Sequence, residues 1–425
     1  MLLLLIFVFM FVFFNVSSFA YKETYFVTLY GDTQYSDNIY LSNTDEEDDV
    51  ITNLGLIFVA DRTSRVSDLK FEYNLGRSFY WQKSSNNAFR HNCSLLYSKE
   101  LSKKLSFSWV GNYYRTEDVI EPDEEVYRER KKREPYYRIS SSFRMSYEYL
   151  KDSFVSFGGN INYLQNKDPS VEDSRIYSEY FSFSRSFTKF FVQVKFLFFQ
   201  REFEQTAPVE TYSNFWSFGY RLAHNKHISW DFSADRTQDK DPSGEDYWSY
   251  SVGISYVWNP EKDQTYYFRL GSYFRKVDGG DKDKGLTFAV NYLKRYKHSS
   301  FSVSGSGGYR YEYAEANNRG FTQYYNISFS YQYQLSRYLD LRSSIFYRIE
   351  DFKERQSKET ETYGFNISLN KRLTKNVTAS LGYSYREADS DFSEDEYCVN
   401  TVIATISYTG EIWKGKEFPI RLWPF

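Results

Sequence analysis

Cysteine and proline are scarce in this sequence of 425 residues, which has two cysteines and eight prolines. Cys93 and Cys398 are too few for the disulfide framework of a small secreted domain, so we expect two unpaired thiols. The prolines form no proline-rich stretch that would indicate a disordered linker between domains. The 53 basic and 56 acidic residues give a net charge of −3, which lacks the basic field typical of nucleic-acid-binding proteins. We therefore expect no nucleic-acid partner.

Long apolar runs are absent except at the N-terminus, where residues 1–14 are all apolar. This run has the length of a signal-peptide core and is too short to span a bilayer as a helix. Ser18 and Ala20 fit a cleavage site, which predicts a signal peptide over residues 1–20 and a mature chain from Tyr21. No lysine or arginine precedes the run, so the signal is atypical, and an uncleaved anchor helix is the alternative.

Sequence motifs of catalysis are also missing. The chain has no Gly-x-Ser-x-Gly, no His-Glu-x-x-His and no phosphate-binding loop. His224 and His227 could bind a metal ion only with a third ligand, and none is apparent. We therefore expect no catalytic residue, metal or cofactor, and a protein that is not an enzyme. An enzyme whose site gathers residues from distant strands remains a less favoured alternative.

Aromatic residues are abundant: 42 tyrosines and 39 phenylalanines bring their share to 21%. They alternate with small or polar residues in long segments, most clearly in 248–258, 301–313, 325–335, 363–370 and 377–386. In 301–313, Phe301, Val303 and Tyr309 lie on one face, and Arg310 and Glu312 lie on the other. This period of two predicts two-faced β-strands.

These strands differ from those of globular proteins, which typically have about 5–6 residues. Their polar faces of Ser, Gly, Asn and Arg suit a water-filled lumen, and tyrosine suits a wall between lipid and water. A closed barrel leaves no unpaired strand edge, as the bilayer requires. The pattern predicts an all-β fold, a transmembrane antiparallel up-and-down β-barrel.

The breaks between strands alternate between short and long, which is typical of outer-membrane barrels with periplasmic turns and external loops. The short breaks are 149–152, 187–189, 335–338 and 372–376; the long ones are 41–48, 116–136, 166–174, 204–210, 236–246, 276–284, 351–360 and 387–396.

We predict one barrel domain over residues 21–425 with about 20 strands, or 18, because such boundaries err by ~2–4 residues. A barrel of this size encloses a lumen. In it Cys93 and Cys398 lie four strands apart, beyond the reach of a disulfide.

The start of the mature chain carries a resemblance to a known family. Asp37-Asn38-Ile39-Tyr40 is followed by an acidic gap and then by Asp49-Val50-Ile51-Thr52 at the start of a strand. Over roughly thirty residues this resembles the β-barrel porin 2 family, a group of outer-membrane barrels associated with exopolysaccharide and PEP-CTERM loci. The resemblance implies an outer-membrane barrel beside polysaccharide export machinery, and it carries over no functional residue. At the other end, Phe425 fits the aromatic terminus of such barrels, but Pro424 leaves 413–425 either a short final strand or a periplasmic extension.

Charged residues on the polar faces are the candidates for the lumen. One hypothesis is a partly basic channel that interacts with acidic sugars or other anions, since arginine rings set anion preference in pores. The favoured interpretation is pairing of arginine with glutamate across strands to stabilise the wall. The candidates are Arg269, Arg275, Arg310, Glu312, Arg342, Arg348, Glu350 and Arg386.

The long loops are acidic in 45–49, 239–246 and 387–396. We favour solvated loops over sites for divalent cations that bridge lipopolysaccharide phosphates, because no fixed ligand spacing occurs. Residues 278–283 are interpreted as a hairpin turn rather than a calcium loop. In 116–136 an acidic block (121–125) precedes a basic block (128–133), and this segment is equally compatible with a constriction in the lumen and with an external loop.

Together these features predict an outer-membrane protein in contact with lipid and lipopolysaccharide. The resemblance adds an expected function as conduit or accessory pore for exopolysaccharide export, with the export machinery as partner. A general or substrate-selective porin for small solutes is the main alternative. A barrel enzyme or a structural surface barrel with a plugged lumen is less favoured.

Overall fold

The computed structural model describes residues 22–118, 133–167, 172–204, 207–240, 245–280, 282–314, 317–353, 358–391 and 395–415, with no side-chain description for 311–320. The predicted signal peptide (1–20), the acidic block 121–125, most of the basic block 128–133 and the end of the tail 413–425 lie outside these residues. In the part that is described, no helix is long and apolar enough to cross a membrane.

Nearly all of the described chain is β-structure, with one short 3-10 helix, η1 (Ser84–Asn86). The strands are β1 (Lys22–Ser36), β2 (Asp49–Thr63), β3 (Ser67–Tyr80), β4 (Ala88–Glu100), β5 (Leu105–Thr116), β6 (Tyr136–Leu150), β7 (Ser153–Asn166), β8 (Ser174–Ser186), β9 (Phe190–Phe203), β10 (Val209–Ala223), β11 (Lys226–Asp239), β12 (Tyr247–Glu261), β13 (Gln264–Val277), β14 (Lys282–Arg295), β15 (Ser299–Ala314), β16 (Asn317–Ser336), β17 (Leu339–Phe352), β18 (Lys358–Arg372), β19 (Val377–Ser390) and β20 (Tyr397–Gly415).

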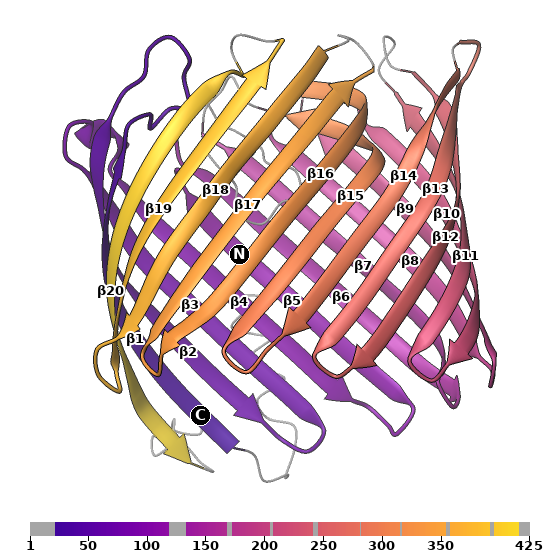
Figure 1. The fold of residues 1–425 in the computed structure, drawn as a ribbon, viewed down its shortest axis with the longest axis horizontal. Coiled ribbons are helices and arrows are strands. Elements are labelled where there is room, and N and C mark those ends of the chain that lie inside the picture. The colour runs from indigo at the N-terminus through magenta and orange to yellow at the C-terminus, as the bar shows by residue number, and fades with distance from the viewer. Residues whose placement is uncertain are drawn as a thin grey trace, which may run out of the picture.

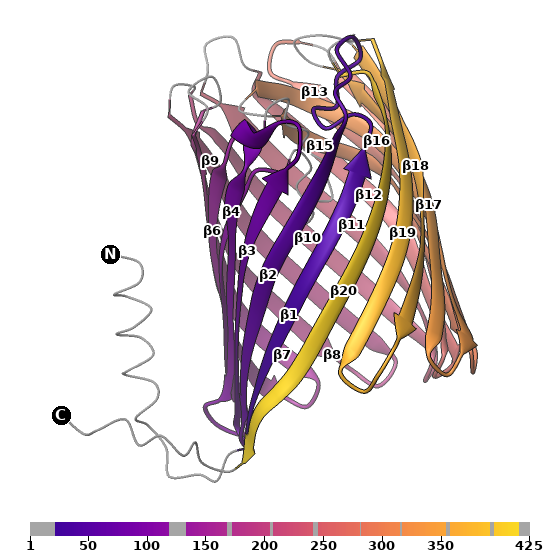
Figure 2. The same ribbon diagram turned by 90° about the vertical axis from the view of Figure 1, so that its left-hand side faces the viewer.

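The strands form one closed antiparallel barrel (Figures 1 and 2). Each strand pairs with the next along the chain, and β20 closes the barrel on β1 from Glu23↔Gly415 to Ser36↔Thr401. Closure lets backbone N–H and C=O groups pair within the sheet, as a bilayer demands. The predicted all-β barrel is confirmed, and the 20-stranded sheet decides between 20 and 18 strands.

The two ends of the barrel differ in their connections. The start of β1 and the end of β20 lie at the lower end in Figure 2, where short turns such as 151–152 and 187–189 join the strands. Longer connections, among them 37–48 between β1 and β2, lie at the opposite end. This asymmetry matches the predicted alternation, and the end with long loops is called here the extracellular end.

Alternating residues divide each strand between two environments, as β12 shows. Val252 and Ile254 are 56% and 48% exposed, whereas Ser249 and Ser255 on the other face are 1% and 4% exposed. The exposed apolar side chains form the outer surface that meets lipid, and the small polar ones line the crowded inner surface. The free thiols of Cys93 and Cys398, on β4 and β20, agree with the prediction of unpaired cysteines.

Candidate functional site: the lumen and its extracellular mouth

Contacts between strands that are not neighbours identify the inner face of the barrel. The Tyr309 hydroxyl on β15 donates a hydrogen bond of 3.0 Å to Asp235 Oδ2 on β11, four strands away. A cavity of about 410 Å³ is lined jointly by residues of β1, β4 and β17–β20. Such contacts are possible only through the interior, so these side chains face the lumen.

The hairpin of β15 and β16 separates from β14 near its extracellular end, while β16 stays paired with β17 up to Thr322↔Phe352. β14 pairs with β15 only from Arg295↔Ser300 to Phe288↔Gly307, although β14 continues to Lys282 and β15 to Ala314. The pairing of β15 with β16 continues without a register shift up to Glu312↔Gly320. In Figure 1 the upper ends of both strands curve away from β14. The hairpin therefore bends as a unit.

Glycine makes this bend possible. A Cβ at Gly307 would lie 2.4 Å from ring atoms of both Phe288 and Tyr325, closer than any real contact. The two rings stack across this position with centroids 6.0 Å apart and an interplanar angle of 10°. The next residue, Gly308, lies against the Thr287 side chain on β14. The strand thus passes from beside β14 to a position over its inner face.

The bent hairpin packs against the inner face of β12 and β13. The Tyr309 and Tyr273 rings are tilted by 47° with centroids 4.7 Å apart, and the ring centroids of Phe321 and Tyr247 are 5.7 Å apart. Phe321, Tyr247, Tyr273 and Val277 form one buried apolar cluster, with Tyr309 packed against it. The hairpin therefore occupies part of the lumen.

This packing corrects one prediction from the alternation. Tyr309 shares a strand face with Phe301 and Val303, and the pattern predicted that the whole face meets lipid. The alternation does continue, but beyond Gly307 the strand has turned inward, so the same face now lies on the opposite wall. Tyr309 is therefore an interior residue.

Arg275 on β13 is the polar centre of this contact. Its guanidinium lies 4.4 Å from the ring centroid of Tyr247 and 4.5 Å from that of Phe321. It also pairs with Asp283 at 2.9 Å and Glu245 at 3.1 Å, and its side chain is 3% exposed. A planar cation between two rings suits arginine, because guanidinium stacks on aromatic faces while its edge binds carboxylates.

Three further predicted residues meet on the inner face of β15 and β17. Glu350 forms ion pairs with Arg310 and, at 3.5 Å, with the Nε of Arg348. The Arg310 guanidinium also lies 4.7 Å from the ring centroid of Tyr324 on β16. One carboxylate thus bridges the hairpin to β17 through two arginines, as the favoured pairing interpretation expects.

The remaining predicted residues lie apart from this group. The Nε of Arg269 is 3.8 Å from Asp231 Oδ2, and Ser217 donates a hydrogen bond of 2.7 Å to the other oxygen of Asp231. Arg342 is exposed, on the same face of β17 as Arg348 but nearer the periplasmic end. Arg386 lines the cavity near the mouth, and the side chain of Glu312 is outside the described part.

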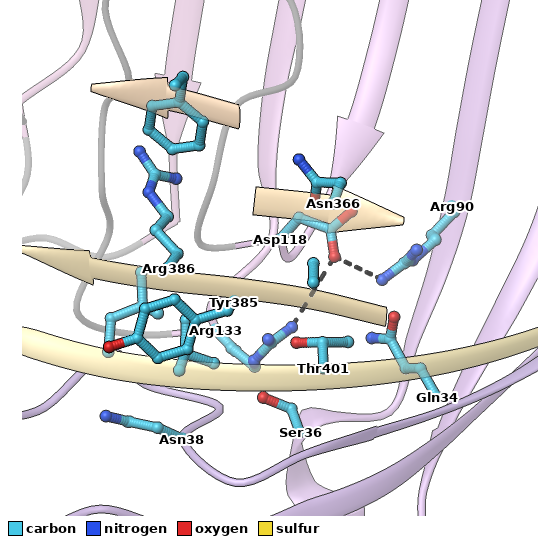
Figure 3. A pocket seen from close by; sticks show the side chains of 14 residues that line it. Gln34, Ser36, Asn38, Arg90, Asp118, Arg133, Asn366, Tyr385, Arg386 and Thr401 are labelled. Atoms are coloured by element: carbon cyan, nitrogen blue, oxygen red, sulfur yellow. Dashed lines mark hydrogen bonds and ion pairs between the residues drawn. The ribbon is translucent and has the colours of Figure 1, made fainter. Parts of the chain in front are cut away.

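That cavity, called here the mouth cavity, also contains residues that the sequence did not single out. Arg90 on β4 binds Glu117 at 2.7 Å and Asp118 at 2.6 Å. Figure 3 shows Asp118 between Arg90 and Arg133, and the Arg133 pair is 3.8 Å long. Arg133 also donates to the Ile39 carbonyl at 2.7 Å and to the Tyr80 hydroxyl at 2.8 Å.

These contacts place both ends of the predicted loop 116–136 within the mouth. Glu117 is fully buried, and the Arg133 side chain is 7% exposed. The basic block contributes Arg133 to the cavity lining, while residues 119–132 lie outside the described part of the chain. The described ends thus enter the lumen, and the position of the segment between them is left open.

The residues that carried the family resemblance hold the barrel together at this end. The Asp37 carboxylate accepts hydrogen bonds of 2.7 Å from both the backbone N–H and the side-chain amide of Asn400 on β20. Asn38 donates to the carbonyls of Ser42 at 2.7 Å and Cys398 at 3.1 Å. Asp49 accepts from the backbone amides of 81–83 at 2.9–3.0 Å. The motif therefore stabilises the seam, meaning the pairing of β1 with β20 that closes the barrel, and it also fixes the loop at 81–83.

The described parts of the acidic loops form ion pairs. Glu47 binds Lys83 at 2.7 Å, and this hydrogen bond raises the pKa of Lys83. Arg236 binds Asp278 at 2.7 Å, and this hydrogen bond lowers the pKa of Asp278. Among the described residues, no three His, Cys, Asp or Glu side chains gather as a metal site. Residues 278–280 form a hairpin turn, with Gly279 at a φ of +77°.

Comparisons with known proteins bear on the fold. No family model matches the chain, and no curated protein matches its sequence. Among solved structures, the copper transporter OprC is similar with a TM-score of 0.55 and 10% identity, covering 93% of this chain and 81% of that chain. OprD of Pseudomonas aeruginosa has a TM-score of 0.40 and 10% identity, covering 92% of this chain and 96% of its own.

At such identities the similarity to OprC shows the fold alone. It agrees with the closed antiparallel sheet. The exposed apolar surface and the alternation of short turns with long loops are this chain's own features of an outer-membrane barrel. The chain is an outer-membrane β-barrel of twenty strands.

Proposed function

We propose that this protein is a substrate-selective channel of the outer membrane, narrowed inside its extracellular end by the β15–β16 hairpin. The observation that carries the proposal is the departure of the hairpin from β14 beyond Gly307. A barrel of this size encloses an aqueous lumen when its wall is complete. A hairpin that packs on the inner face of β12 and β13 reduces that lumen and presents charged side chains to whatever passes.

A general porin and a plugged structural barrel fit the geometry less well. A general porin needs a wide aqueous lumen, and here an aromatic cluster anchors the hairpin inside it and narrows it. A plugged barrel needs a filled mouth, and here a cavity of about 410 Å³ lies between β1, β4 and β17–β20. The channel proposal accounts for both the anchor and the cavity.

Exopolysaccharide export is our second proposal, and it rests on the resemblance near Asp37. One structural observation supports it: beyond Gly307 the hairpin has no backbone ladder to β14. Side-chain contacts alone hold the hairpin to β11–β13, while β16 stays paired with β17 up to Thr322↔Phe352, so the hairpin can swing about its edge with β17. An outward movement would widen the lumen for a polymer, whereas small solutes need only the form observed.

A disulfide across the bend tests the channel proposal. The Cβ of Thr287 lies 3.9 Å from the Cβ position of Gly308, close to the mean of about 3.8 Å for disulfides. We would introduce Thr287→Cys and Gly308→Cys in a background with Cys93→Ser and Cys398→Ser, and record single-channel conductance in planar bilayers before and after reduction. A steady small conductance in the oxidised form, with additional larger openings after reduction, is expected.

The same variant separates the two proposals in cells. If the hairpin must move for export, oxidation blocks polymer secretion while uptake of small solutes continues. Either single-cysteine variant is the matched control, because it cannot form the bond. An absence of conductance in both redox states would refute the channel proposal, and unchanged secretion by the locked protein would refute export through a moving hairpin.

A further inference from the structure

The outer face of the barrel carries two arginines near its extracellular end, Arg77 on β3 and Arg115 on β5. We propose that they bind phosphate groups of lipopolysaccharide in the outer leaflet of the membrane. Together with the aromatic residues that contact them they are called here the outer arginine patch: Arg77, Arg115, Phe79, Phe89 and Tyr137. Figure 2 shows the extracellular ends of β3 and β4 side by side in the wall. The inference goes beyond the proposed channel and does not depend on it, because the patch lies outside the lumen.

Strand pairing places these side chains on the side that faces lipid. Arg77 lies opposite Leu54 on β2 and Phe89 on β4, and Arg115 lies opposite Tyr137 on β6. Residues that are directly opposite in a sheet project from the same face. Leu54 and Phe89 are 54% and 48% exposed, as expected of the outer surface, and Arg77 is exposed as well. Both arginines therefore point toward the membrane.

Aromatic rings and one backbone carbonyl hold the two guanidinium groups. That of Arg77 lies 5.0 Å from the ring centroid of Phe79 and 4.8 Å from that of Phe89. That of Arg115 lies 5.6 Å from the ring centroid of Tyr137, and its Nη1 donates a hydrogen bond of 2.7 Å to the Phe89 carbonyl. Stacking uses the face of a guanidinium, so N–H groups on its edge remain for phosphate oxygens.

No acid on this face neutralises the patch. Among the described residues, neither Arg77 nor Arg115 forms an ion pair with a carboxylate. The outward positions in the extracellular halves of β2–β6 carry no aspartate or glutamate. Charged side chains on a lipid-facing surface are costly unless they reach a polar partner at the interface. The head groups of the lipids around the barrel provide that partner.

The acids of the adjoining loops bind other groups. Glu117 and Asp118 bind Arg90 inside the barrel. The loop 37–48 lies toward β20, and its contacts and those of Asp49 are Asp37 with Asn400, Asn43 with Glu396, Glu47 with Lys83, and Asp49 with the amides of 81–83. Glu134, three residues before Tyr137, is exposed. Even when Glu134 is counted against the two arginines, one positive charge remains.

The arrangement favours lipopolysaccharide over a phospholipid. Only β4 separates β3 from β5, so the backbones that carry the two arginines are roughly 10 Å apart. Lipid A, the anchor of lipopolysaccharide, has a phosphate at each end of its sugar head group, whereas a phospholipid has a single phosphate. The long loops mark this end as extracellular, where lipopolysaccharide forms the outer leaflet. Aromatic rings at this level suit the boundary between acyl chains and head groups.

Titration of the purified full-length barrel with lipid A in an uncharged detergent tests the patch. Lipid A without its phosphates and phosphatidylglycerol are the comparison lipids, and bound lipid is counted by native mass spectrometry. We expect lipid A to bind at least about tenfold more tightly than either, because hydrogen bonds between charged partners are stronger than neutral ones. Equal binding of dephosphorylated lipid A would overturn the phosphate site. Equal binding of phosphatidylglycerol would overturn its assignment to lipopolysaccharide.

The matched variants are the double substitution Arg77→Gln with Arg115→Gln, and Arg185→Gln. Arg185 is exposed on the outer face of β8 and lies 4.7 Å from the ring centroid of Phe187, but it is at the periplasmic end. We expect the double variant to bind lipid A about tenfold more weakly or worse, and Arg185→Gln to bind it like the unaltered barrel. If the double variant fails to fold, as judged by heat-dependent migration on gels, Arg77→Gln alone replaces it. Unchanged affinity in the folded patch variant, or an equal loss in Arg185→Gln, would overturn the site.

Discussion

At the scale of single residues, polar side chains of the lumen hold the β15–β16 hairpin against the opposite wall. Tyr309 joins the hairpin to Asp235 on β11, and Arg275 joins it to β13 through the Phe321 ring. Neither contact lies in the backbone ladder. The ladder between β16 and β17 fixes one edge of the hairpin, and these side chains fix its contact with the opposite wall, which single substitutions can alter while that ladder stays intact.

Replacement of Tyr309 by phenylalanine removes the hydrogen bond to Asp235 and keeps the ring. A hydrogen bond to a charged group contributes about 1.5–3 kcal/mol, so the fraction of time in which the hairpin is released rises about tenfold or more. The measurement is the frequency of larger openings in planar-bilayer recordings. Tyr331→Phe on the outer face is the control. Equal frequencies in both variants would show that the Tyr309 hydroxyl does not hold the hairpin.

Sequence alternation predicted which face a residue occupies better than which neighbours it has. Arg275, Arg348 and Glu350 lie on the inner face because alternation fixes their side of the strand. Arg90 and Asp118 were not singled out, because their contact joins β4 to a loop end that no periodicity describes. Contacts across a lumen depend on the three-dimensional closure, and a single sequence carries little signal for them.

At the scale of elements, strand count and connection lengths followed from the sequence, and the bend in β15 did not. Alternation continues through Gly307 without interruption, so a period of two cannot report the change of direction. One signal in the sequence could have indicated it, the glycines at 305, 307 and 308. A strand with a glycine cluster can turn away from one neighbour, here β14, while its hairpin partner β16 stays paired with β17.

A side chain at Gly307 is expected to disturb this bend. Gly307→Val places a Cβ where the Phe288 and Tyr325 rings lie, and overpacking of this kind costs about 1–3 kcal/mol. The thermal transition of the folded barrel, followed by heat-dependent migration on gels, should therefore fall. Gly305→Ala is the matched control, because its nearest contact would be an ordinary 3.4 Å. Similar transitions in the two variants would contradict the role given to Gly307.

The turn between β13 and β14 provides a pH-dependent element. The hydrogen bond from Arg236 lowers the pKa of Asp278. The ion pair between the two residues is therefore fully formed above the ordinary aspartate pKa, and it is lost as the pH falls through the lowered pKa. The turn should stay ordered from neutral pH to about pH 4 and loosen below it. Hydrogen exchange of 278–280 as a function of pH measures this. In Asp278→Asn exchange should be faster at neutral pH without the acid transition; a retained transition would assign it to another group.

At the scale of the whole molecule, closure of the sheet creates the lumen and brings side chains of distant strands together. Because the number of strands is even, β20 runs antiparallel to β1, and their pairing completes the wall. The seam is reinforced at the extracellular end by Asp37 and Asn38, the residues that carried the family resemblance. In the structure this motif therefore stabilises the pairing of β1 with β20.

The hydrogen bonds of Asp37 to β20 lead to a prediction about the stability of the whole barrel. Asp37→Ala removes two hydrogen bonds to Asn400, each to a charged acceptor and each worth about 1.5–3 kcal/mol in folded proteins. We expect a lower thermal transition and faster hydrogen exchange at the extracellular ends of β1 and β20, while the periplasmic half of the seam keeps its protection. Asp45→Ala, an exposed acid in the same loop, is the control for the loss of charge. If both variants melt alike, the backbone ladder between β1 and β20 alone holds the seam; a selective effect of Asp37→Ala would show that side chains beyond the ladder complete the closure.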